Sequence, residues 1–401
     1  MNSNMNIPGL KDVMVDQVEE QMGRIVLYIS LPKKEHTCPA CGQKTSKVHD
    51  YRMQKIKHLK WFERFTILFY KRRRYACTCG KRFSENTSFV DRYQRFSKEW
   101  NQVVQIRSVK AKTFKEAAEI LGTSSATVIR RFKQLVKTLP SGVQLPRAIA
   151  IDEYKADTDA GKYQLIIADA ETHAPIDILP NRRKETIKQY LQENGANVEI
   201  VVMDMNPSFK AAVNKALNRP VIVADRFHYC RYIHWAVDEV RRKVQKEWHT
   251  YDRKKVKKMR YVLHKSPEAL TLEERWYLKR YTDMSPELKE AYELKELYKK
   301  WQNDSRKEMN ISVVKAGLEA FYRKVEETQN PAFLKAIKTF KNWQVEILNS
   351  FAFGYSNGFL EGINNTSKVI KRNAYGFRKF EHFKAKILLN TVYKNVGVHL
   401  G

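Results

Sequence analysis

The sequence predicts a multidomain α+β protein, in which a mixed α/β core carries a large all-helical insertion and follows two small N-terminal modules. Three observations predict this organisation. Four of the five Cys lie within the first 80 residues, among short β-type runs. A pair of short helical segments around a glycine turn comes next. Short apolar strands and helices then alternate, and a long basic helical stretch separates them from a last amphipathic helix.

Size and charge limit the possible functions. A chain of 401 residues is long enough for two or three domains. Lys and Arg total 74 against 44 for Asp and Glu, a formal net charge of +30. Such an excess indicates a polyanionic partner, with nucleic acid well ahead of an anionic membrane. No apolar run approaches the roughly 20 residues that span a bilayer, and the polar N-terminus lacks a signal-peptide region, so we expect a cytoplasmic protein.

Residues 1–95 are expected to form a small zinc-binding β module. The alternating run RIVLYISL predicts a strand. A C-x-x-C and a C-x-C pair follow, each with two thiolates on one tight turn: Cys38, Cys41, Cys77 and Cys79. Four thiolates suit a tetrahedral structural Zn²⁺, and paired spacing favours zinc over unpaired cytosolic thiols. The C-x-C pair departs from the usual knuckle, and His49 or His58 is an alternative ligand that we do not favour. Cys230 is far away and expected to be buried.

Residues 96–140 are expected to form a helix-turn-helix domain that binds DNA. In TFKEAAEILGTSSATVIRRF, apolar residues recur at helical spacing on both sides of a turn at Gly122. Hydroxyl side chains stand at the start of the second helix, where base edges are read: Ser124, Ser125 and Thr127. Arg130 and Arg131 follow one turn later and are better placed for phosphates. The alternative is an amphipathic helix pair within a bundle.

Residues 147–234 and 352–401 are expected to form the mixed α/β domain, after a linker with Pro and Gly at 141–146. Three apolar strands, AIAIDEY, YQLIIAD and PIDIL, precede the helix ETIKQYLQ, the strand VEIVVMD, the helix PSFKAAVNKAL and the strand VIVAD. This order predicts a sheet of mixed strand directions and fits ribonuclease H-like topology. Residues 235–351 are almost wholly helical and basic, which predicts an α-helical insertion domain.

Three acids stand at positions that this topology can bring together. Asp152 ends the first strand, Asp204 ends the fourth, and Glu361 lies near the start of the late helix. The carboxyl ends of neighbouring parallel strands open into one crevice, so the two Asp can converge there and a helical Glu can join them. Three close carboxylates need shared cations, and hard oxygen ligands select Mg²⁺ or Mn²⁺. Two such ions would clamp the attacking and leaving oxygens of an in-line phosphodiester displacement.

Each acid alone is more simply explained as a helix cap or surface residue, as Asp204 just before Asn206-Pro207 illustrates. Their joint position favours the metal site. Asp225 also ends a strand and is an additional candidate, either as a fourth ligand or as a substrate-orienting residue. Glu153 alternates to the opposite face from its neighbour and is expected to be structural.

Two basic clusters are candidates for phosphate contact. Arg72, Arg73 and Arg74 precede the second Cys pair, so a zinc-stabilised fold would hold them rigidly. A charge run is more often only a solvated face. Lys368, Lys371 and Arg372 follow Glu361 on its helix and would flank DNA that enters the metal site.

Taken in order, the zinc module, the helix-turn-helix, the split sheet and the terminal Glu helix resemble bacterial insertion-sequence transposases of the ISL3 family. The resemblance covers nearly the whole chain. Its most specific segments are AIDEY at Asp152, VVMDMNPSF at Asp204, VADRFHY at Asp225 and SNGFLEGINNTSKVIKRNAYGFRKFEHFKAKIL around Glu361.

The resemblance implies a DDE triad of Asp152, Asp204 and Glu361, with Mg²⁺ as the working metal. It also implies that the N-terminal modules bind the terminal inverted repeats and that the helical stretch before Glu361 is an insertion in the catalytic domain. The expected partners are double-stranded DNA of the transposon ends and the target, and a second copy of the chain, since transposases pair two ends. The expected location is the bacterial cytoplasm, at the nucleoid when bound to DNA.

Two other functions stay open at this point. A domesticated regulator would use the N-terminal modules to bind DNA without catalysis, but the intact set of three acids argues against it. A structure-specific nuclease of the same fold, such as a junction resolvase, would not need the long N-terminal DNA-reading region. The sequence therefore favours a transposase.

Overall fold

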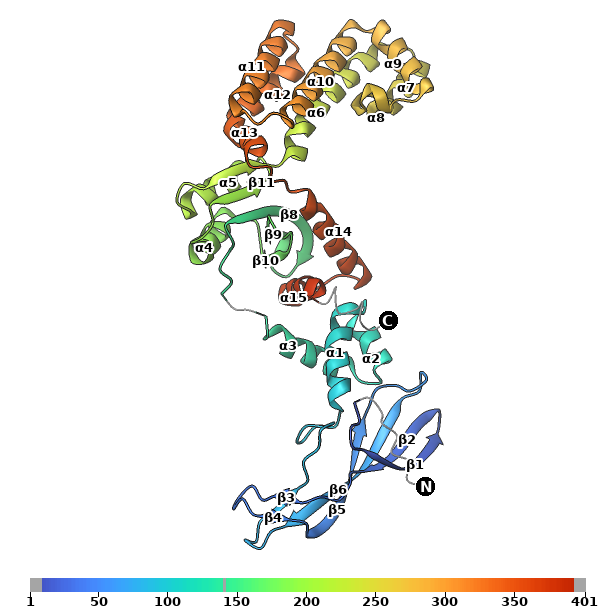
Figure 1. Cartoon of the computed structure of the whole chain (residues 1–401). Helices are drawn as coiled ribbons and strands as arrows, with labels where there is room; N and C mark the ends of the chain where they lie inside the picture. The colour runs from blue at the N-terminus through green and yellow to red at the C-terminus, as the bar shows by residue number, and fades with distance from the viewer. Residues whose placement is uncertain (1–8, 140–141, 393–401) are drawn as a thin grey trace. The chain divides into compact units, whose positions relative to one another are not determined.

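The computed structural model describes residues 9–139 and 142–392 (Figure 1). The chain forms two compact units, one made mainly of residues 1–141 and one that runs from Gly142 to Thr391. Parts of the expected domains at residues 1–8, 140–141 and 393–401 lie outside the described residues. The expected mixed α/β, multidomain organisation is confirmed, with a β-rich and helix-turn-helix region first and a largely helical region after it.

The first unit begins with a five-stranded sheet of order β1-β2-β6-β5, with β7 paired to β6. Only β2 and β6 pair in parallel. One face of this sheet is apolar and carries Leu27, Ile56, Leu68 and Tyr70, all buried. The strand bounds are β1 (Met14–Gln21), β2 (Arg24–Ser30), β5 (Val48–Lys57), β6 (Thr66–Ala76) and β7 (Arg82–Ser84), and a separate hairpin joins β3 (His36–Thr37) to β4 (Lys44–Thr45).

Three helices complete the part of the first unit that the structure describes: α1 (Lys98–Lys110), α2 (Phe114–Ile120) and α3 (Ser125–Val136). Each begins at a hydroxyl N-cap that accepts a backbone N–H, which supplies one of the hydrogen bonds that a helix start lacks. Trp100 and Val128 are buried in the core between them. Gly122 has a φ of +60° in the turn before α3, where a side chain would be strained.

The second unit is built on a five-stranded sheet of order β10-β9-β8-β11-β12. β8 pairs antiparallel with β9 and parallel with β11, and β11 pairs parallel with β12. This mixture of strand directions is the one that the sequence predicts. The bounds are β8 (Ala148–Thr158), β9 (Gly161–Asp169), β10 (Pro175–Leu179), β11 (Ile200–Met203) and β12 (Val221–Ala224).

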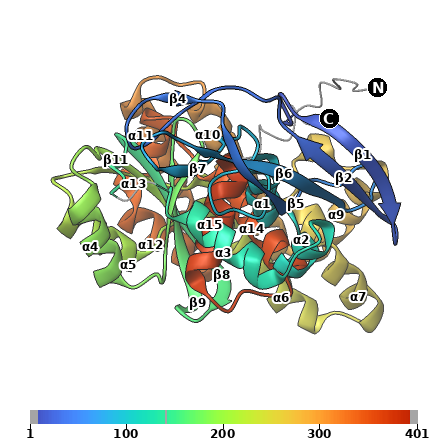
Figure 2. The same cartoon turned by 90° about the horizontal axis from the view of Figure 1, so that it is seen from below.

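Helices cover both faces of this sheet, since alternate residues of its strands enter two different cores. Ile149 and Ile151 of β8 pack toward α4 (Lys184–Asn194) and α5 (Pro207–Ala216). Ala148 and Ala150 face α14 (Gly358–Asn373) and α15 (Phe380–Val392). Figure 1 and Figure 2 both show α4 and α5 on one side of the sheet, with α14 and α15 on the other.

A helical region interrupts the α/β part between β12 and α14. Its first helix, α6 (Arg226–Val244), runs without a break from the end of β12 and packs against α10 and α12. In the described part of the chain, no helix combines the length and apolar character that a membrane span needs. The remaining bounds are α7 (Thr250–Lys258), α8 (Arg260–His264), α9 (Leu272–Met284), α10 (Pro286–Ser305), α11 (Ile311–Thr328), α12 (Pro331–Asn342) and α13 (Gln344–Ala352).

Candidate functional site

Three aspartates stand side by side at the carboxyl edge of the second unit's sheet. The parallel register aligns Ala150 with Val202 and Val202 with Val223, and all three pack on the α14 face. Each has an Asp two residues further along the chain: Asp152, Asp204 and Asp225. Asp204 and Asp225 directly follow β11 and β12, but the expectation that Asp152 ends the first strand is wrong, because β8 continues to Thr158 through its pairing with β9. The strand order thus brings together two acids that the sequence predicts as a pair and the third that it adds as a candidate.

Asp152 is largely withdrawn from water and hydrogen-bonded to α14. Asn364 Nδ2 donates to its Oδ2 over 2.6 Å, and the backbone N–H of Glu153 donates to its Oδ1 over 2.7 Å. Burial, followed by the negative charge of Asp204, raises the pKa of Asp152 to about 7. This carboxyl group is therefore partly protonated near neutral pH unless a nearby positive charge stabilises its ionised form.

His228 joins the aspartates from the first turn of α6. Its Nδ1 lies 2.9 Å from Asp204 Oδ2. Burial opposes its protonation, but the hydrogen bond and negative charge of Asp204 outweigh burial and raise the His228 pKa. Ligand atoms of Asp204, Asp225 and His228 all lie within 4.8 Å of one another, so these three side chains could hold a metal ion.

Asp225 is the most buried of the three aspartates, at 5% exposure. Burial raises its pKa, although the backbone N–H of Asn357, which donates to Asp225 Oδ1 over 3.1 Å, lowers it. Asn357 is the N-cap residue of α14, and its Nδ2 also donates to the Ile151 carbonyl over 3.2 Å. The start of α14 is therefore tied to β8 at Ile151 and to Asp225, which follows β12.

Glu361 lies on α14 between the two asparagines that contact the aspartates. It follows Asn357 by four residues and precedes Asn364 by three, so all three side chains share one side of the helix. Glu361 itself is exposed and lies in the first turn of α14. The group of ligand atoms within 4.8 Å of one another contains Asp204, Asp225 and His228, and neither Glu361 nor Asp152 belongs to it.

His228 and the two asparagines are the neighbours that the sequence prediction does not single out. The spacing Asp225-x-x-His228 at a helix start places both residues on one side of α6, a signal that was present in the sequence. Glu153 lies outside this group, as expected. Arg182 Nη1 donates to Glu153 Oε2 over 2.6 Å.

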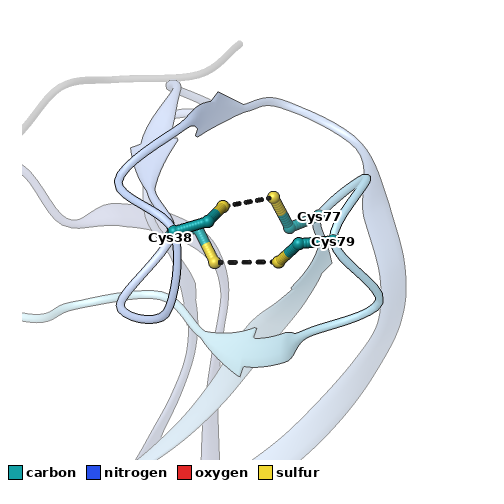
Figure 3. Close-up of side chains that lie close together, drawn as sticks. Cys38, Cys77 and Cys79 are labelled. Atoms are coloured by element: carbon teal, nitrogen blue, oxygen red, sulfur yellow. Dashed lines mark hydrogen bonds between the residues drawn. The ribbon is translucent and has the colours of Figure 1, made fainter.

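The four N-terminal cysteines meet in one cluster, as Figure 3 shows for Cys38, Cys77 and Cys79. Cys38 Sγ lies 3.7 Å from Cys79 Sγ, and Cys41 Sγ lies 3.5 Å from Cys77 Sγ. A tetrahedron of sulfurs about 2.3 Å from a zinc ion has edges of about 3.8 Å. The arrangement therefore supports a structural Zn²⁺.

Each Cys pair lies on a tight turn whose glycine has positive φ, +76° at Gly42 and +84° at Gly80. The backbone N–H of Cys79 lowers the pKa of the Cys77 thiol to about 6, which favours the thiolate that zinc needs. The C-x-C pair thus supplies two sulfurs despite its short spacing. His49 and His58 are not in the cluster, and His58 Nδ1 instead lies 2.8 Å from Ser97 Oγ.

The N-terminal basic block occupies β6 and is largely engaged by the protein. Arg73 Nη1 donates to the Leu31 carbonyl over 2.6 Å and lies 3.3 Å from Glu85 Oε2, which is buried. Arg72 Nη2 donates to the Glu85 carbonyl over 3.0 Å. Arg74 Nη1 lies 3.0 Å from Asp50 Oδ2. These contacts order the three guanidinium groups on the sheet.

The other side chains predicted to contact DNA differ in how far they are exposed and in whether the protein itself already engages them. On α3, Ser124 caps the helix by accepting the N–H of Thr127, and Arg130 is exposed. Arg131 Nη2 donates to Gln94 Oε1 over 2.9 Å. On α14, Lys371 Nζ lies 3.1 Å from Asp157 Oδ2. Exposed side chains in these two groups include Lys368 and Arg372, and Ser125 is partly exposed.

Cys230, expected to be buried, is partly buried against the helical core. Its Sγ lies 3.3 Å from the Tyr298 hydroxyl, and burial raises the pKa of the thiol. This cysteine is part of the packing of α6 and takes no part in either cluster.

Three family models match successive parts of the chain. The zinc-finger of transposases IS204/IS1001/IS1096/IS1165 matches residues 34–79, and the helix-turn-helix domain of transposase family ISL3 matches residues 85–136. The ISL3 model described as a transposase matches residues 149–387, more than half of the chain. The zinc-finger match includes all four clustered cysteines, and the transposase match includes all the clustered acids.

Two curated proteins are similar to the chain over very different lengths. A transposase for insertion sequence element IS1001 from Bordetella parapertussis is 25% identical over 407 residues, covering 95% of this chain and 96% of that protein. An ATP-dependent protease from Lactococcus lactis subsp. lactis is 49% identical over 53 residues, only 13% of this chain and 17% of that protein. So short a match carries no argument about the rest of either protein.

The matches agree with the order of elements in the structure: a cysteine-bearing β module, a helix-turn-helix, and an α/β unit with a long helical interruption. The matches identify the protein as a DNA-cleaving and strand-transferring enzyme of DNA transposition, with an N-terminal helix-turn-helix for DNA binding. The chain belongs to the ISL3 family of transposases.

Proposed function

We propose that Asp152, Asp204 and Glu361 form the catalytic, metal-holding triad of this transposase, in a ribonuclease H-like catalytic domain. The observation that carries the proposal is the row of aspartates on neighbouring strands, on the sheet face covered by α14, the helix that bears Glu361. The domain comprises residues 147–234 and 352–401, with 235–351 as its helical insertion. The zinc module (1–95) and helix-turn-helix (96–140) precede it, before a linker at 141–146.

The donor set fits a hard divalent cation, Mg²⁺ or Mn²⁺. Carboxylate oxygens are the ligands that these ions prefer. The high pKa of Asp152 is the mark of a buried acid whose charge is not compensated by the protein alone. Asn357 Oδ1 and Asn364 Oδ1 are also buried beside the aspartates, without a hydrogen-bond partner in the described residues. When bound, the ions polarise the scissile phosphate and lower the pKa of the attacking water or hydroxyl.

The neighbouring side chains orient the triad. Asn364 Nδ2 and the Glu153 N–H each hold one oxygen of Asp152, which fixes the plane of its carboxylate. His228 holds one oxygen of Asp204 and leaves the other free for the ion. Asp225 adds negative charge to the site and anchors the start of α14, so it either serves as a fourth ligand or positions the helix of Glu361.

The proposed DNA contacts follow from the same assignment. The N-terminal modules bind the terminal inverted repeats, with base edges contacted by Ser124, Ser125 and Thr127 and phosphates by Arg130 and Arg131. Arg72 and Arg74 are further phosphate candidates, whereas Arg73 is engaged by a buried acid. Lys368, Lys371 and Arg372 flank DNA at the triad. Pairing of two transposon ends requires at least a homodimer on DNA, in the cytoplasm of a bacterial cell.

Cleavage and strand transfer on transposon-end DNA with Mg²⁺ test the proposal. Asp152→Asn, Asp204→Asn and Glu361→Gln should each reduce both reactions to background while end binding is retained. Asp169→Asn is a matched control, because Asp169 ends β9 at the opposite edge of the sheet and should keep activity. If one triad variant retains near-normal rates, that residue is not a ligand. Cleavage with no preference for end sequence would instead favour a nuclease.

A further inference from the structure

The sheet of the first unit has a second face that is rich in aromatic and basic side chains. We call it the open face; it lies opposite the apolar core of Leu27 and Leu68. The register places Tyr28 beside Phe69, Lys55 beside Phe69, Met53 beside Lys71, and Tyr51 beside Arg73. Tyr51 and Met53 are more than half exposed, at 54% and 56%.

Two of the rings on this face, Phe69 and Tyr51, have a lysine ammonium group over them. Tyr28 and Phe69 stack with their centroids 5.4 Å apart and their planes 18° apart. Lys55 Nζ lies 5.8 Å from the Phe69 centroid, and Lys71 Nζ lies 4.9 Å from the Tyr51 centroid. A nucleobase can take the place of an ammonium group on such a ring, and the displaced Lys is then free to meet a phosphate.

The open face continues toward the recognition helix. One groove is lined by Tyr28, Tyr51, Phe69 and Lys71 together with Met53. A second groove, also lined by Met53, runs past Lys55 and Lys57 to Ser124 and Thr127 at the start of α3. The exposed Tyr93 borders this second groove. DNA held at α3 would thus reach the rings along a continuous surface within one unit.

The charges on the sheet limit where a DNA strand can bind. The cations of the open face are on β5 and β6, whereas β1 brings the acid Asp16 to the far side of the first groove. Asp16 Oδ1 accepts the Ser30 hydroxyl over 3.0 Å. A polyanion is therefore favoured along β5 and β6 and disfavoured beyond β2.

We propose that the open face binds an unpaired strand of DNA that continues from the duplex held by α3. The inference rests on the proposed function only in taking transposon-end DNA as the ligand. Bases inside a duplex are stacked on each other and cannot reach these rings, so the face selects single strands and tolerates any base sequence. It would hold a strand that is unpaired at the transposon end, away from the triad.

Equilibrium binding to labelled DNA tests this with the full-length, zinc-loaded protein. The probes are a single strand of about 12 nucleotides and a transposon-end duplex. Tyr51→Ala should weaken single-strand binding about tenfold and duplex binding less than about twofold. Tyr51→Phe should bind the single strand like wild type, because the ring alone stacks. Tyr261→Ala removes another exposed tyrosine, on α8, and should change neither affinity.

Equal losses on both probes after Tyr51→Ala, or no loss on the single strand, would overturn the inference. So would Tyr51→Phe binding as weakly as Tyr51→Ala. Wild type that binds and cleaves duplex ends but has no affinity for the single strand would sink this inference and leave the triad intact. Triad variants that still cleave end DNA at near-normal rates would sink the proposed function and leave the open face intact.

Discussion

The thiol cluster and the carboxylate cluster are both candidate metal sites, but they are built in opposite ways. The four cysteines come from two tight turns within one module, and their sulfurs all lie within 4.8 Å of one another. The aspartates come from three strands, and the acid that we add to them comes from a helix more than 150 residues after Asp152. Soft, closed ligand sets suit structural zinc, whereas hard, open ones leave room for a substrate.

This difference predicts separate consequences of metal loss, the largest at the thiol cluster. Cys77→Ser should remove the bound zinc, unfold the β3–β4 hairpin and abolish end binding, because zinc contributes about 10 kcal/mol or more to small structural sites. Zinc content by atomic absorption and proteolysis of residues 34–79 measure the loss. Cys230→Ser, outside the cluster, should retain zinc. If the protein still binds transposon ends after zinc removal, the thiol cluster is not needed to fold the DNA-binding module, and the contrast between the two sites is wrong.

A smaller effect is expected from a residue that only orients a carboxylate. Asn364→Ala removes the 2.6 Å hydrogen bond to Asp152 and should reduce Mg²⁺-dependent cleavage by about 10–100-fold, partly restored at high Mg²⁺. Asn365→Ala changes an exposed neighbour on the same helix and is the control. If both variants cleave alike, α14 does not organise the site through Asn364.

The pKa of Asp152 predicts a pH dependence of stability without added divalent metal. Its value of about 7 in the folded protein exceeds the ordinary 3.8, so the folded state binds more protons between these values. The free energy of unfolding should therefore fall as pH rises from about 4 to 7, by up to about 1.4 kcal/mol per pH unit from this group. Urea unfolding of the zinc-loaded protein measures the slope. Asp152→Asn should flatten it, and an unchanged slope would contradict the assignment.

The smallest expected effect concerns DNA at the first unit. Arg130 is exposed on α3, and Arg130→Ala should weaken binding to end and unrelated duplexes alike. The slope of log affinity against log salt should decrease by about 1, as for one lost phosphate contact. A loss confined to the end sequence would instead show that Arg130 contacts a base.

The sequence predicts the individual strands of the second unit well, because β8, β11 and β12 each contain an apolar run that leads into an Asp. It does not show that β8 continues beyond Asp152 to Thr158. It does not specify which strands are neighbours. That Asp225 stands beside Asp204 follows from the pairing of β11 with β12, a long-range packing result. The family-level function is confirmed, whereas the triad stays a prediction that the geometry supports.

The first unit shows what local patterns miss. β1 and β5 are mostly polar, and the sequence does not predict them as strands, since each has one face in solvent and few apolar residues to mark it. The run Arg72–Arg74 predicts phosphate contact, but strand alternation turns its members to different faces. Arg73 forms an ion pair with Glu85. Glu85 is brought close to Arg73 by the pairing of β6 with β7, which the sequence does not show.

The most direct test of the central claim exchanges a hard ligand for a soft one at Glu361. Glu361→Cys should be inactive with Mg²⁺ and regain part of its cleavage with Mn²⁺, which accepts a thiolate more readily. Thr366→Cys, exposed on another side of α14, should cleave with both metals. Recovery in Mn²⁺ alone is the result expected if Glu361 holds the catalytic ion. Equal activity of Glu361→Cys in both metals, whether high or absent, would contradict it.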